Sequence, residues 1–454
     1  MRTNIAAVVL VSILIPCLAG AEPSRLADLA HMARSGSPAE ATPAIDALRQ
    51  AGPAGMEAML AACADGSCGD VLDRVCGVHD CADIRLFWYT DLDAAKAAAR
   101  ASGKPILSLR LMGKLDEEFS CANSRFFRTV FYNNREINQI LRDRYILHWR
   151  SVRPVPKVTI DFGDGSRLER TLTGNSIHYV LDSRGRLLQP LPGLYGPESF
   201  RDALKDAEKA SRAAARMDDE KYSSWVAARF EGQLSRAADS LLRDQEALAP
   251  APPAPPAPAP PVPAPEPVAE TDLLPIAAAQ IEDLEKVPTA RDPWAVLANT
   301  PGVLTDRIDV GGNTGSKSAY EGPGLREIVD VSDDQVKQLG RLRRPRIHLD
   351  PSSRAFLLRK QGITDPKAAE RLVDTFETTV ALDEVIDEYR TGPAILKKLI
   401  EPETRKDFDL EAFNQWIYAD IFQTPLSDPW LGLEPKDVYG ALPASARTAA
   451  SAKP

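Results

Sequence analysis

The chain has 454 residues, a formal net charge of −9, and charged side chains at 26% of its positions. An acidic balance argues against nucleic acid as the main partner, because binding to phosphates requires clustered Lys and Arg. At about 150 residues per domain, the length predicts about three domains.

Residues 1–21 have the pattern of a secretory signal peptide. Arg2 supplies a positive charge, residues 5–18 are almost wholly apolar, and Ala19, Gly20 and Ala21 fit a cleavage site of small residues. The apolar run is too short to favour a membrane-spanning helix, and no later segment is apolar over about 18 consecutive residues. We therefore expect a periplasmic or secreted mature chain without a transmembrane segment.

Four cysteines are clustered in residues 22–83, a region whose Ala-rich pattern predicts a helical cap on the next domain. In an oxidising compartment such a cluster predicts two disulfides, and the sequence leaves all three pairings open. The spacing lacks the close Cys-x-x-Cys pairs of structural zinc sites, which favours disulfides over a metal site. We expect no metal and no other cofactor. The four residues are Cys63, Cys68, Cys76 and Cys81.

Residues 84–210 alternate between strand and helix patterns, which predicts an α/β domain. The expected helices cover 91–102 and 123–142, and a hairpin over 158–172 turns at Asp164 and Gly165. The expected strands cover 84–89, 106–112, 145–152, 177–181 and 186–191. A helical pattern then runs to about residue 248, so residues 211–248 are expected to form a helical extension.

Cys121 stands apart from the cluster, at the start of the helix expected over 123–142, with Ser124 three residues later. A helix N-terminus stabilises a thiolate, and the Ser124 hydroxyl lies about one turn away, where it could donate a hydrogen bond to the sulfur. Such a thiol could attack a disulfide or a peroxide. The alternative interpretation is that Cys121 is a small apolar residue of a structural fold.

Four segments of this region, 94–107, 120–124, 174–182 and 191–195, resemble the thioredoxin-like domains of exported bacterial proteins. More specifically, residues 120–128, 149–155 and 424–433 resemble one such family of unassigned function. The resemblance implies a thioredoxin-like fold over 84–210, with Cys-x-x-Ser in place of Cys-x-x-Cys.

The same resemblance implies roles for particular residues. Cys121 would be the catalytic nucleophile and Ser124 its partner, while Asn175, Ser176 and His178 would line the substrate groove. Two positions depart from the family pattern. Ser176 stands where these proteins usually have a cis-proline, and the tryptophan that commonly precedes the redox cysteine is absent.

Two further expectations concern residues near the candidate site. In a second interpretation, His178 and His148 are hydrogen-bonded histidines in or near the core rather than functional groups. Three adjacent acids, Asp116, Glu117 and Glu118, are expected to be solvated in a loop.

The rest of the chain divides by composition. Residues 249–270 are rich in Pro and Ala and predict an extended linker. Residues 271–324 include a stretch, 284–313, that resembles the plug segment of TonB-dependent receptors; too little chain follows to build a receptor barrel. Helical patterns predict a mainly α-helical C-terminal domain over 325–438, and residues 439–454 are expected to be a disordered tail.

Two functions follow from these patterns. The first is monothiol exchange or thiol capture through Cys121, supported by Ser124. The second is a non-catalytic module, built on a degenerate thioredoxin-like fold, that holds another envelope or secreted protein. The sequence gives neither the partner nor the oligomeric state.

Overall fold

The structure is a computed structural model that describes residues 22–64, 66–171, 175–248 and 331–428. The expected signal peptide, Pro/Ala linker, plug-like segment and C-terminal tail lie outside the described residues, as do residues 429–433 of the resembling segment. The domain boundaries therefore stay predictions.

The N-terminal region is helical, as its Ala-rich pattern predicts. Ser37 precedes the second helix, where its backbone N–H donates to the Glu40 carboxylate at 2.9 Å, and Gly77 ends the fourth in a left-handed conformation. Two disulfides join Cys63 to Cys68 and Cys76 to Cys81. The prediction of two disulfides is thus confirmed, and each bond links neighbours in the cluster. The helices are α1 (Glu22–Ser35), α2 (Pro38–Gln50), α3 (Pro53–Ala62), α4 (Gly69–Cys76) and α5 (Cys81–Ile84).

A five-stranded mixed sheet forms the centre of the α/β region, with strand order β1-β3-β2-β6-β7. The strands β1, β2 and β3 are parallel, whereas β6 runs antiparallel to both β2 and β7. All seven residues of β2 are buried, which explains its nearly continuous apolar sequence. The bounds are β1 (Trp88–Tyr89), β2 (Ile106–Met112), β3 (Ile146–Arg153), β6 (Ser176–Leu181) and β7 (Leu187–Pro192).

Helices α6 (Leu92–Ser102), α9 (Pro197–Ala214) and α10 (Asp219–Leu248) follow the expected pattern, but two other expectations were wrong. The expected helix over 123–142 is divided into α7 (Ala122–Phe126), the π-helical turn η1 (Phe127–Phe131) and α8 (Arg135–Arg144). Asn134 starts α8 as a new helix, because its side chain accepts hydrogen bonds from the Glu136 and Ile137 amides. The strand expected over 84–89 shrinks to two residues, because α5 extends to Ile84 and Arg85 turns the chain with φ of 50°.

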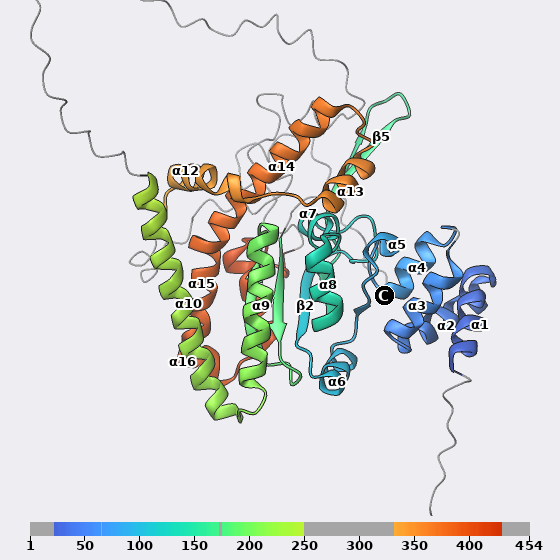
Figure 1. The fold of residues 1–454 in the computed structure, drawn as a ribbon, viewed down its shortest axis with the longest axis horizontal. Helices are drawn as coiled ribbons and strands as arrows, with labels where there is room; N and C mark the ends of the chain where they lie inside the picture. Colours follow the sequence, from blue (N-terminus) through green and yellow to red (C-terminus); the bar gives the residue numbers. More distant parts are fainter. Residues whose placement is uncertain (1–21, 65, 172–174, 249–330, 429–454) are drawn as a thin grey trace, which may run out of the picture.

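The C-terminal part is helical and packs directly on the sheet region (Figure 1). Some of its buried residues, among them Ile395 and Tyr418, belong to the same hydrophobic cluster as Leu109 of β2. Its elements are α12 (Asp333–Arg343), η3 (Arg344–Arg346), α13 (Pro351–Gln361), α14 (Pro366–Ile386), η4 (Asp387–Thr391), α15 (Gly392–Ile400), α16 (Pro402–Lys406), α17 (Leu410–Trp416) and η5 (Ile417–Ile421).

The two faces of the sheet carry different helices. On one face, His178 of β6 meets the rings of Phe127 and Phe200, which come from η1 and α9. On the opposite face, the Tyr179 hydroxyl donates to the Asn414 side chain of α17 at 3.0 Å. The sheet is therefore enclosed on the second face by the end of its own chain.

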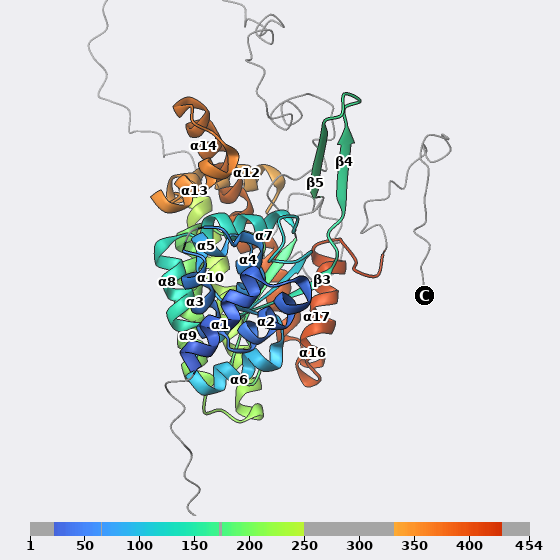
Figure 2. The ribbon, with the colours of Figure 1, turned by 90° about the vertical axis from the view of Figure 1, so that its right-hand side faces the viewer.

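A two-stranded hairpin, β4 (Lys157–Asp161) and β5 (Arg167–Thr171), stands apart from the central sheet. Figure 2 shows it rising above the central sheet, to about the same height as α14. Gly163 and Gly165 both have positive φ in its turn, close to the position that the sequence predicts. No helix among the described residues is long and apolar enough to cross a membrane.

Candidate functional site

Cys121 lies at the N-cap of α7, after the loop that follows β2. Its amide donates to the Met112 carbonyl at 3.0 Å, which anchors the start of the helix to the end of the strand. The thiol therefore lies at the beginning of the helix that follows the central strand β2.

The thiol and Ser124 are in contact, but the expected direction of the hydrogen bond was wrong, because the thiol and not the hydroxyl is the donor. The Cys121 Sγ donates to the Ser124 Oγ at 3.4 Å, and that hydroxyl contacts the Ser120 Oγ and the Cys121 carbonyl, each at 2.7 Å. Cys121, Ser120 and Ser124 all have 0% exposed area. A reagent or a second protein cannot reach the sulfur while the chain holds this arrangement.

Two arginines follow Cys121 in the chain, the partly buried Arg125 and the buried Arg128. Arg128 donates to the Glu118 carbonyl at 3.2 Å and lies 3.5 Å from the Asp80 carboxylate. Arg125 donates to the Thr171 hydroxyl at 2.8 Å and so joins α7 to the base of the β4–β5 hairpin. Burial lowers the pKa of both guanidinium groups from its usual value.

The three residues predicted to line a groove are all buried. The Asn175 side chain donates to the Phe422 carbonyl at 3.3 Å and to the Thr424 hydroxyl at 3.2 Å. Ser176 pairs with Leu111 inside the sheet. No open groove is therefore lined by these residues in the described structure.

His178 agrees with its second interpretation, a hydrogen-bonded histidine of the core. Its Nε2 lies 2.9 Å from the Tyr132 hydroxyl. Burial lowers the pKa of His178 to about 3, so the ring is neutral at ordinary pH. His148 is similar: its Nδ1 lies 2.7 Å from the Ser108 hydroxyl, and burial lowers its pKa to about 3.

The C-terminal segment that covers Asn175 is bonded to two neighbouring parts of the sheet region through Tyr418. The Tyr418 hydroxyl donates to the carbonyls of Asn175 and Arg110 at 3.2 and 3.4 Å. Burial raises the pKa of Tyr418 well above its ordinary value, which keeps this hydroxyl protonated as a donor. No local pattern in the sequence indicates the contact between Tyr418 and Asn175, because the two residues are separated by 243 positions.

Segments that resemble the family meet in one place. The Gly113 amide, just after β2, donates to the Arg153 carbonyl at 2.8 Å. The Arg153 side chain donates in turn to the Asp428 carbonyl at 2.7 Å. Residues 149–155 and 424–428 are thus neighbours of the loop that leads to Cys121.

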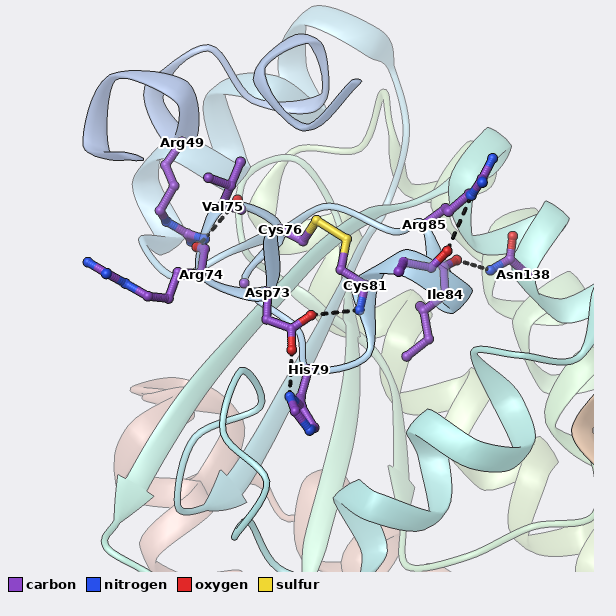
Figure 3. The surroundings of a disulfide bond; sticks show 12 residues. Arg49, Asp73, Arg74, Val75, Cys76, His79, Cys81, Ile84, Arg85 and Asn138 are labelled. Atoms are coloured by element: carbon purple, nitrogen blue, oxygen red, sulfur yellow. Dashed lines mark hydrogen bonds and ion pairs between the residues drawn. A yellow bond between two sulfur atoms is a disulfide. The ribbon is translucent and has the colours of Figure 1, made fainter. Parts of the chain in front are cut away.

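A cluster that sequence reasoning missed surrounds the Cys76–Cys81 disulfide (Figure 3). His79 lies between two carboxylates: its Nδ1 is 2.5 Å from Asp73 and its Nε2 is 2.6 Å from Glu118. Asp73 also accepts from the Cys81 amide at 2.8 Å. These hydrogen bonds raise the pKa of His79 to about 9.

Glu118 lies in a loop with 54% of its side chain exposed, as expected, but it also bonds to His79, which the sequence did not predict. Its bond to His79, and secondarily the charges of Lys360 and Arg128, lower its pKa to about 2 despite partial burial. Asp116 is also partly buried, and that burial raises its pKa. The sequence did contain a signal for this cluster: His79 lies between Cys76 and Cys81, and an acidic run follows at 116–118. Within the described ranges, no three His, Cys, Asp or Glu side chains gather so as to hold a metal ion.

Comparison with known proteins gives no name for this arrangement. No protein-family model matches the chain, and no curated protein matches it significantly.

Proposed function

We propose that the chain is an exported, thioredoxin-like protein that acts as a non-catalytic interaction module in the envelope or outside the cell. The fold assignment is supported by the sheet, in which a parallel β–α–β unit is followed by an antiparallel hairpin. It is also supported by the position of Cys121 at the helix after β2. The export assignment rests on the sequence of residues 1–21.

One observation carries the choice of a binding role over a catalytic one. Cys121 is completely buried, and Asn175 of the expected groove is bonded to the chain's own residues Phe422 and Thr424. Thiol–disulfide exchange requires direct attack of the sulfur on a partner's disulfide. A substrate would have to displace a packed part of the fold before that attack.

Alkylation of the native protein tests this proposal. Cys121 is the one free cysteine within the described residues, so mass spectrometry after iodoacetamide treatment reports on it directly. We expect alkylation in native buffer to be at least a hundredfold slower than in denaturant, and Cys121→Ala to retain any partner that the wild type binds. Rapid native labelling, or loss of partner binding in Cys121→Ala, would contradict a non-catalytic role.

Monothiol exchange is the second candidate, favoured by the Cys121–Ser124 contact at the start of α7. It requires the C-terminal segment to move away. In that case Tyr418→Ala, which removes the bonds to Asn175 and Arg110, should make Cys121 form mixed disulfides with oxidised glutathione. Tyr389→Ala, at a buried tyrosine of η4 that contacts Asp244, is the matched control. If exposure of the thiol by Tyr418→Ala produces no mixed disulfide, the second candidate is wrong.

A further inference from the structure

The β4–β5 hairpin has a free edge. Within the described part of the chain, β4 pairs only with β5. Figure 2 shows the hairpin standing apart from α13 and α14, whereas in the view of Figure 1 it rises beside them. An unpaired edge is a template for another strand, and an isolated two-stranded hairpin is marginal by itself.

The register of the hairpin shows which backbone groups face outward. The Phe162 amide donates to the Ser166 carbonyl at 3.1 Å, and the same register pairs Ile160 with Leu168. In an antiparallel ladder, hydrogen-bonded and non-hydrogen-bonded pairs alternate. The amides and carbonyls of Lys157, Thr159 and Asp161 therefore point away from β5.

The side chains alternate in the same way. Lys157, Thr159 and Asp161 lie on one face of the hairpin, and Val158, Ile160 and Leu168 lie on the other. Among the described residues, the three apolar side chains join neither hydrophobic cluster of the protein. Phe162, at the turn, is 47% exposed. Val158, Ile160 and Leu168 are partly buried, so the hairpin carries a narrow apolar face that is only partly covered.

We propose that β4 pairs antiparallel with β4 of a second copy of this chain, around a two-fold axis through Thr159. In this register Lys157 lies opposite Asp161 of the second copy. By symmetry, Asp161 lies opposite Lys157 of the second copy. Val158 lies opposite Ile160 of the second copy, so the two apolar faces join into one strip. Opposite charges and apolar residues that face one another across strands are the stabilising pairs of a sheet.

The charges within one hairpin favour this arrangement. Arg167 bonds to Asp161 at 3.0 Å within the hairpin, so Lys157 of the second copy would extend this pair into a row of three alternating charges, which ends at Thr171 of the second copy. Lys157 is free to move, because its own contacts are a 4.0 Å approach to Glu169 and the face of the Phe119 ring. Its side chain is 44% exposed, and that of Asp161 is 51% exposed.

The other edge of the hairpin fits a second copy less well. On β5 the outward carbonyl of Glu169 already accepts a hydrogen bond from Arg170 at 3.0 Å. The register that pairs all five residues of β5 would also place Glu169 opposite Glu169 of the second copy, and like charges in this position are destabilising. The second copy is therefore assigned to β4.

Sedimentation equilibrium of the full chain measures the association. A pair of five-residue strands is a small contact, so we expect a dissociation constant on the order of 10 µM. Lys157→Glu and Asp161→Lys should each weaken self-association at least tenfold, because each places like charges across the interface. An equimolar mixture of the two variants should form a heterodimer, since every cross-strand pair is then complementary.

The mixture also controls for folding, because a heterodimer forms only if both variant hairpins are intact. Thr159→Pro should abolish association by removing an outward amide, whereas Glu169→Pro, its neighbour across the hairpin, should leave it unchanged. A wild type that stays monomeric at 500 µM, single variants that still dimerise, or a mixture that does not would each overturn the proposal.

Discussion

His79 is held between Asp73 and Glu118, and this arrangement keeps its imidazole protonated at neutral pH. The bonds connect α4 to the loop before Cys121, and the His79 amide reinforces them by donating to the Leu115 carbonyl at 2.9 Å. Lys360 of α13 reaches the same place, 2.7 Å from Asp80. One protonated ring thus connects the N-terminal helices to the loop beside the candidate site.

The raised pKa of His79 makes stability depend on pH. Because its pKa rises from 6.5 to about 9 on folding, the proton stabilises the fold fully below pH 6.5, and this contribution is lost as the pH rises through 9. We expect about 1–2 kcal/mol of this contribution, allowing for the exposed part of Glu118. Urea unfolding of wild type and His79→Gln between pH 6 and 10 measures it. The exposed His31→Gln is the control, and an identical pH profile in His79→Gln would contradict the prediction.

Arg110 and Arg150 offer a second test at the scale of single residues, because both bind Glu411. Arg110 is completely buried, 2.6 Å from Glu411 and 2.6 Å from the Ser108 hydroxyl, whereas Arg150 is 59% exposed and 3.3 Å from Glu411. We expect Arg110→Ala to cost about 2–4 kcal/mol, and Arg150→Ala at most about 1 kcal/mol. Chemical denaturation measures the loss of unfolding free energy in each variant. Equal losses would contradict the prediction that the buried arginine contributes more than the exposed one.

At the scale of elements, the two disulfides are a matched pair, since each closes a loop of the same sequence separation, 5. The chain-entropy estimate gives about 2 kcal/mol for a loop of this size. We expect Cys76→Ala with Cys81→Ala to lose this amount and also to flatten the pH dependence that His79 produces. Cys63→Ala with Cys68→Ala should lose a similar amount with the pH profile unchanged. Equal pH profiles in the two double variants would disprove the connection between the second disulfide and His79.

Sequence patterns predicted most of the regular elements for local reasons. The apolar run over 106–112 became β2, and Asp164 and Gly165 lie in the turn of the hairpin. The spacing of Cys121 and Ser124 correctly predicted their contact. Each of these features depends on residues that are close together in the chain.

The features that the sequence did not predict depend on distant contacts. Nothing near Asn175 indicates that Phe422 and Thr424 bind it, and nothing near Arg110 indicates Glu411, 301 positions later. Asn134 competes locally with helix continuation as an N-cap, which the hydrophobic spacing over 123–142 conceals. The C-terminal segment covers the candidate site through contacts between distant residues, and the hydrophobic periodicity of the sequence does not indicate such contacts.

At the scale of the whole molecule, the C-terminal helices and the sheet share buried contacts. The Leu194 amide donates to Asp387 at 2.8 Å, and the Ser353 hydroxyl of α13 donates to the Val130 carbonyl at 2.9 Å. Phe126 and Phe376 stack with ring centroids 5.2 Å apart. The two parts should therefore unfold together, because neither can expose this surface without a large loss of apolar burial.

Cleavage of the connecting segment tests this cooperation. We expect a protease recognition sequence inserted after Ala259 to give two fragments that stay together through gel filtration and melt in one transition. The same cut sample in 6 M guanidinium chloride, where the fragments separate, is the control. Fragments that elute apart in native buffer would show that the connection, and not the shared core, holds the parts together.

The chain leaves the described body at Leu248 and returns at Val331, and both residues belong to one hydrophobic cluster. Asp244 and Arg343, just inside the two ends, are joined at 2.7 Å. The entropy of closing a connection between two such ends changes by only about 0.6 kcal/mol for each doubling of its length. The junction between Leu248 and Val331 is thus a place where the chain tolerates added or deleted sequence at little cost to the fold.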